Sequence, residues 1–106
     1  AHDTISQHQP LKTFLTASIK TNEPALEYLD RLQSLAKTAR LAGGSVTKRD
    51  IVRQFLSGIP GKHPRYGTHV SAISTEIVLG TRHYSLKNIR RIFVAMQTQD
   101  SPPRHY

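Results

Sequence analysis

Residues 21–44, TNEPALEYLDRLQSLAKTARLAGG, decide the fold of this chain. Apolar side chains recur there every three or four residues, which is the spacing of one face of a helix. Asn22 predicts the N-cap, because a short polar side chain accepts a hydrogen bond from the first turn. Gly43 and Gly44 predict the end, since glycine readily adopts the left-handed conformation that closes a helix. The expected buried face consists of Ala25, Tyr28, Leu29, Leu32, Leu35, Ala36 and Ala39.

A shorter helix is expected before this stretch, over residues 10–20. Pro10 suits the first turn of a helix, because a proline there gives up no internal hydrogen bond. The apolar spacing of three and four continues through Leu11, Phe14, Leu15 and Ile19. Residues 1–9 are polar and aperiodic, so we expect a flexible N-terminal arm there.

Two further helices are predicted from capping signals. Thr47 stands three residues before Asp50, a variant of the capping box, and predicts a helix from Lys48 to Ser57. Ser85 is a good N-cap for a closing helix that runs to about residue 98. Its apolar face consists of Leu86, Ile89, Ile92, Phe93 and Met96.

A helix between these two follows from Tyr66, Val70, Ile73 and Ile77, which recur at four, three and four. The fold expected is therefore all-α, a compact bundle of four to five short helices over residues 10–98. Residues 99–106 contain a Pro-Pro pair and predict a linker or tail. A chain of 106 residues is long enough for one modest core.

The composition of the chain excludes several function classes. It contains no cysteine, which removes disulfides, thiolate metal sites and cysteine nucleophiles. No apolar run approaches the length of about 20 residues that a membrane helix needs, and the N-terminus has no signal-peptide core. We therefore expect a soluble, intracellular protein with no membrane partner.

No enzymatic motif is present. His63 and His69 are six residues apart, which matches no common zinc spacing. Carboxylates such as Glu23 and Asp50 stand at expected helix starts, where capping explains them. The sequence contains no nucleophile elbow, phosphate-binding glycine loop or HExxH. We expect no catalysis, no cofactor and no metal.

The positive charge of the chain leaves two alternatives open. Fifteen Lys and Arg against seven Asp and Glu give a formal net charge of +8, and such an excess favours polyanions. The charges are dispersed along the sequence, however, and tryptophan is absent, so no aromatic platform for stacking bases is evident. The chain either binds RNA weakly through its basic surface or has a basic surface that is merely solvated.

Arg31 also has two interpretations. It can pair with Glu27 one turn earlier, a surface interaction worth about 0.3–0.5 kcal/mol. Alternatively it lies beside the buried face and ties Glu23 and loop carbonyls into a partly buried network, in which removal of one partner costs about 3–5 kcal/mol.

Residues 23–32, EPALEYLDRL, resemble the major homology region of retroviral and retrotransposon Gag capsid proteins. In that family Glu-Pro leads into a helix that carries an aromatic residue, an Asp and an Arg. The following LAGGSVTKRDIVRQFLSGIP is similar to the Gag polyproteins of copia-type (Pseudoviridae) LTR retrotransposons, which end a capped helix in Leu-x-Gly-Leu-Pro. The chain departs from the retroviral pattern at Ile19-Lys20, where those proteins carry Gln-Gly.

This resemblance implies the C-terminal domain of a capsid protein, with Glu23, Tyr28 and Arg31 as the structural network of the homology region. It also implies homodimerisation through the helix after the homology helix. The interface residues would then be Lys48, Ile51, Val52 and Phe55. The alternative is that Ile51 and Val52 belong to the core, because a small bundle needs its β-branched residues inside.

The function implied is self-association with other Gag copies into virus-like particles in the cytoplasm that package RNA. Many modest interfaces suffice for such a shell through multivalency. Two alternatives remain: a basic RNA-binding or chaperone module, and a truncated or domesticated Gag fragment that inhibits particle assembly.

Overall fold

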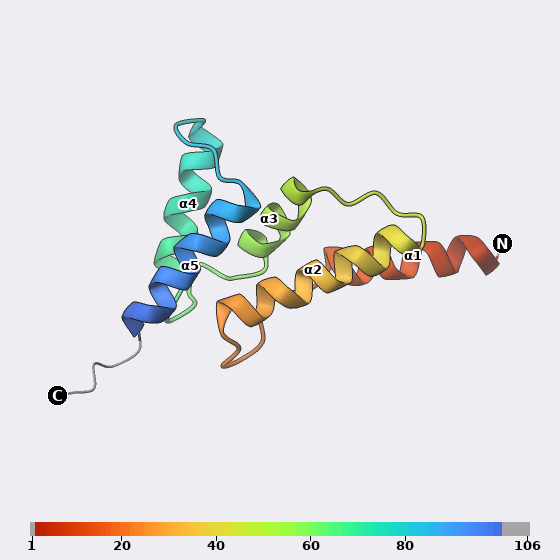
Figure 1. The fold of residues 1–106 in the computed structure, drawn as a ribbon, viewed down its shortest axis with the longest axis horizontal. Helices are drawn as coiled ribbons and strands as arrows, with labels where there is room; N and C mark the ends of the chain where they lie inside the picture. The colour runs from red at the N-terminus through yellow and green to blue at the C-terminus, as the bar shows by residue number, and fades with distance from the viewer. Residues whose placement is uncertain (1, 101–106) are drawn as a thin grey trace.

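Five helices form the described part of the chain in a computed structural model (Figure 1). It describes the backbone of residues 2–100 and the side chains of residues 9–97. The helices are α1 His2–Leu15, α2 Ala25–Leu41, α3 Lys48–Ser57, α4 Gly67–Leu79 and α5 Leu86–Asp100. No strand occurs within residues 2–100, so the predicted all-α class is confirmed.

The five helices form an elongated body, although they do not all run in the same direction. Figure 1 shows α1 and α2 as an antiparallel pair on one side and α4 and α5 on the other, with α3 between them. The principal extents are 61, 33 and 24 Å. The element that the sequence analysis placed at the centre, α2, packs on α1, α3 and α5.

Helix α2 has the predicted buried face. Six of the seven residues expected there are buried, and the seventh, Leu35, is half-buried against the core. The helix ends in a Schellman motif: the N–H of Gly44 donates to the carbonyl of Ala39 over 2.8 Å, and that of Gly43 to Arg40 over 3.0 Å. Gly43 has φ 97°, as a glycine C-cap requires.

The start of α2 differs from the prediction. Pro24, not Asn22, is the N-cap residue, and its backbone is extended. Asn22 has φ 64° and lies in the turn before the helix, a conformation that asparagine tolerates better than most residues. The turn is fixed by Glu23, which accepts a hydrogen bond from the Lys20 N–H.

Helix α1 covers a different range from residues 10–20. It begins at His2, where the sequence predicts an arm, and Pro10 lies inside it. It ends at Leu15, and the hydroxyl of Thr16 donates to the Lys12 carbonyl over 2.8 Å. Such local bonds compete with helix continuation. Beyond this point the chain crosses to α3, where the Ile19 N–H donates to the Gly58 carbonyl.

The predicted caps of α3 and α5 are confirmed. Thr47 and Asp50 form a reciprocal capping box. Ser85 and Asn88 exchange the same pair of bonds at the start of α5. The helix continues to Asp100, and the rest of the tail predicted over 99–106 lies outside the described residues.

Aromatic rings connect the two ends of the core. Tyr28 stacks on Phe55 with 5.5 Å between ring centroids, and Phe55 meets Phe93 edge-on at 5.0 Å. The Tyr66 ring also contacts the Phe93 ring, with 5.8 Å between centroids. The rings come from α2, α3, α5 and the residue before α4, so one continuous contact joins these four parts.

Helix α4 is buried only in its first half. Val70 and Ile73 belong to the core, whereas Ile77, expected on the same face, is 41% exposed. The next two residues, Val78 and Leu79, are 84% and 69% exposed. The apolar end of α4 is therefore a surface feature.

Gly58 allows Tyr28 to pack against the end of α3. A Cβ built on Gly58 would lie 1.7 Å from the Tyr28 hydroxyl oxygen and 3.0 Å from the Ala17 carbonyl oxygen. We expect Gly58→Ala to lower the free energy of unfolding by about 2–3 kcal/mol, because the ring must leave its position. Urea denaturation measures this loss.

Gly61→Ala is the matched control, since its Cβ would meet only the Ser71 hydroxyl at 3.2 Å. A Gly58→Ala variant as stable as Gly61→Ala would contradict the close packing described.

Candidate functional site

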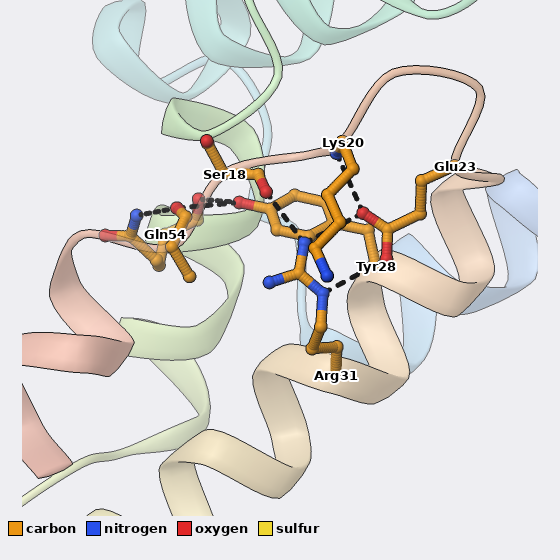
Figure 2. Close-up of polar contacts among 7 residues, drawn as sticks. Ser18, Lys20, Glu23, Tyr28, Arg31 and Gln54 are labelled. Carbon is orange, nitrogen blue, oxygen red and sulfur yellow. Dashed lines mark hydrogen bonds and ion pairs between the residues drawn. The ribbon is translucent and has the colours of Figure 1, made fainter.

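The molecule has two candidate functional sites: the network around Glu23 and Arg31, and a basic groove beside α3. In the network, Glu23 and Arg31 form a bidentate ion pair (Figure 2). The Nε of Arg31 donates to Oε2 of Glu23 over 3.1 Å, and Nη2 donates to Oε1 over 2.8 Å. The same Nη2 donates to the Ser18 carbonyl over 2.7 Å. Arg31 thus binds both Glu23 and a loop carbonyl, the partners that the second interpretation of this residue describes.

The environment of this pair favours the charged form of both groups. The Glu23 and Arg31 side chains are only 12% and 27% exposed. The hydrogen bond from Arg31 is the main cause that lowers the pKa of Glu23, and the same bond raises the pKa of Arg31. Burial opposes both shifts but is the weaker effect. The pair therefore stabilises the fold as an ion pair.

Tyr28 extends the network to α3. Its hydroxyl lies 3.1 Å from the Gln54 carbonyl and 3.3 Å from the Ala17 carbonyl, and it has one proton to donate between them. The Gln54 side chain also donates to the Ala17 carbonyl, over 2.8 Å. Burial raises the pKa of Tyr28 to about 12, so the phenol stays neutral. Figure 2 shows these groups converging on the segment before α2.

The guanidinium of Arg31 lies 5.3 Å from the centroid of the Tyr28 ring, within the range of a cation–π contact. The three residues predicted for the network are thus in mutual contact. Gln54 was not predicted, because no local pattern in α3 marks it as a partner of residue 17.

The predicted interface residues are placed differently. Ile51, Val52 and Phe55 are 3%, 5% and 0% exposed within one chain, so they do not form an exposed apolar patch in this conformation. Ile51 and Val52 belong to the core, which was the alternative expected for them. The physical reason is that α3 lies between α2 and α5 and contacts both. Of the four residues, only Lys48 is exposed.

The outward side of α3 forms one wall of an open groove of about 1070 Å³. The rest of its lining comes from Gln33 of α2, the second half of α4, the turn after α4 and the start of α5. The basic residues of the lining are Lys48, Arg49, Arg53, Arg82, His83, Lys87 and Arg90. None of the lining residues is an Asp or Glu.

Three of these cations already have neighbours within the chain. Arg90 contacts Gln33 and forms an ion pair with Asp30 over 2.6 Å, which ties α5 to α2. Arg82 lies over the Tyr84 ring, 5.4 Å from its centroid. The guanidinium of Arg53 helps to lower the pKa of Asp50, although the backbone bond at Thr47 is the main cause.

The groove could not be recognised in the sequence. Its cations lie in residues 48–53 and 82–90, two segments that only the fold brings together. A cluster of basic residues in one of the segments would have been the only available signal.

Among residues 2–100, no helix combines the length and the apolar composition needed to cross a bilayer. Among the side chains of residues 9–97, no three His, Asp or Glu gather closely enough to hold a metal ion.

We expect Arg31→Ala to lower the free energy of unfolding by about 3 kcal/mol, because it leaves the carboxylate of Glu23 half-buried without its partner. Arg31→Lys should recover only part of this loss, since an ammonium cannot make both parallel bonds. Urea denaturation at neutral pH measures both. Lys37→Ala, an exposed cation on the same helix, should change stability by less than about 0.5 kcal/mol; an equal effect of the two alanine variants would contradict the network.

The ion pair also predicts a specific pH dependence. The folded-state pKa of Glu23 lies below its ordinary value of 4.5, so the stability it contributes is present above pH 4.5 and is lost as the pH falls through the lower folded-state value. The stability difference between wild type and Glu23→Gln should therefore be constant near neutral pH and shrink in acid. Urea midpoints measured across the acid range check this, and a difference that does not change with pH would refute it.

A scan against protein-family models, a search of curated proteins and a search of solved structures each returned no match for this chain.

Proposed function

We propose that the chain is a structural self-association domain of a Gag-like capsid. The observation that carries the proposal is the Glu23–Arg31 network, which occurs at the spacing of the homology region that residues 23–32 resemble. The order of the helices agrees with the proposal: a helix with Glu-Pro at its start is followed by a capped helix that ends at Gly58.

The network suits an assembly domain because it fixes the relative position of helices. Arg31 holds residues 18–23 against α2, and Tyr28 holds residue 17 against the end of α3. A surface carried by helices in fixed positions loses little conformational entropy on association. Many copies with small, preorganised contacts can then form a stable shell.

The contact surface proposed here is the apolar end of α4, not the buried face of α3. Pairing of the outward side of α3 with its own copy would bring Arg49 and Arg53 close to the same cations of the partner. Like charges opposed across an interface are unfavourable. Val78 and Leu79 instead present exposed apolar side chains that a partner would remove from water.

The partners in this proposal are other copies of the same chain, in a particle that forms in the cytoplasm and encloses RNA. The domain needs neither a cofactor nor a catalytic residue for this role.

Light scattering after gel filtration, over a range of protein concentrations, tests the proposal. The average mass of the wild-type chain should rise with concentration, and Val78→Asp plus Leu79→Asp should keep it monomeric. A charged side chain at each position makes removal of the patch from water unfavourable. Both sites are exposed, so the variant should keep its fold and its urea midpoint.

Leu41→Asp is the matched control, since Leu41 is 80% exposed but lies at the end of α2. It should associate like the wild type. A wild-type chain that stays monomeric at every concentration would refute self-association, and an associating Val78→Asp, Leu79→Asp variant would refute the α4 surface. Ile51 and Val52 are unsuitable for this test because aspartate there would disrupt the core.

A further inference from the structure

The positive charge of the chain is concentrated in the groove beside α3. Six of the fifteen Lys and Arg line it, without any Asp or Glu. Outside the groove the nine other Lys and Arg nearly balance the seven Asp and Glu. The charges that look dispersed in the sequence therefore gather on one surface of the folded chain. Such a surface concentrates polyanions and raises their rate of association.

Two helix starts add to this field. Lys48 and Arg49 belong to the first turn of α3, and Leu86 and Lys87 to the first turn of α5, and all four line the groove. Helix N-termini carry a partial positive charge that adds to that of the side chains. Their capping boxes satisfy part of the backbone N–H groups, so long side chains provide most of the binding capacity.

The chemistry of the groove favours a phosphate chain over an acidic protein segment. Protein segments usually bind through apolar or aromatic anchors that enter pockets. Among the apolar lining residues, Val52, Leu56 and Tyr84 are buried within this chain. The exposed ones, Ile77 and Val78, lie on the α4 side only, whereas the cations lie on both sides. The available contacts are cations on both walls, and evenly charged phosphates match this arrangement.

We propose that this groove binds the phosphodiester backbone of a single nucleic-acid strand. The volume of the groove, about 1070 Å³, lies at the upper end of the range of about 300–1,000 Å³ typical of small-molecule sites, and the groove is open, so an extended ligand can enter it. The lining contains no Phe or Trp, and its tyrosine, Tyr84, is buried and cannot stack on bases. Binding is therefore independent of base sequence and sensitive to salt. The inference is carried by the cations of the groove and not by the apolar end of α4, although Val78 belongs to both surfaces.

The salt dependence of binding tests the inference quantitatively. Fluorescence anisotropy with a labelled short single-stranded RNA gives the slope of log affinity against log salt concentration. If the five cations other than Arg90 each contact one phosphate, the slope should approach about −3.5, from about −0.7 per contact on a single strand. Arg49→Ala plus Lys87→Ala, one change on each wall, should reduce its magnitude by about 1.4.

Lys12→Ala plus Lys37→Ala is the matched control, because it removes the same charge from exposed positions outside the groove. It should leave the slope nearly unchanged. Equal effects of the two double variants, or a wild-type slope near zero, would overturn the inference. Unchanged urea midpoints would verify that all variants are folded, and light scattering on the same samples would separate this result from any effect on self-association.

Two further ligands identify the chemistry that is recognised. Single-stranded DNA of the same sequence should bind with similar affinity, because the proposed contacts are to phosphates; binding of RNA alone would overturn a backbone site. Polyglutamate should bind much more weakly at the same salt concentration. Equal or tighter binding of polyglutamate would assign the groove to an acidic protein partner instead.

Discussion

The fold depends on the position of the Tyr28 side chain. Its ring is fully buried against Phe55, and its hydroxyl reaches the carbonyls of Ala17 and Gln54. This position is possible only because Gly58 has no side chain. One aromatic residue of α2 thus fixes both the segment that enters α2 and the end of α3. Arg31 of the Glu23–Arg31 pair lies over the same ring and binds the Ser18 carbonyl, which holds the segment before α2 in place.

Much of this architecture follows from local patterns in the sequence. The faces of α2 and α5 were predicted by their apolar spacing. The capping box at Thr47 and the N-cap Ser85 predicted where α3 and α5 begin. These signals work because they depend on residues three or four positions apart. The start of α2 was not predicted, since Asn22 adopts a left-handed turn whose bonds come from Glu23 and not from its own side chain.

The candidate sites could be predicted only in part from local sequence patterns. Glu23 and Arg31 are eight residues apart on neighbouring elements, so their pairing could be proposed from the sequence. Ile51 and Val52 could not be assigned, because a core face and an interface face have the same spacing and composition. The groove needs residues about 35 positions apart to meet across α3 and α5, and such a contact depends on how the helices pack.

The uneven burial of α4 has a consequence for how the molecule moves. Local opening requires the least free energy where few apolar contacts are lost, and the last turn of α4 buries no large apolar side chain, although Glu76 in that turn accepts a hydrogen bond from the Tyr84 hydroxyl. That turn and the residues after it also line the groove, so the groove has one wall anchored in the core through α3 and one wall that opens more easily. A ligand that spans both walls must order the second one, and this entropic cost lowers its affinity. The same property lets a single groove accommodate strands of different local shape.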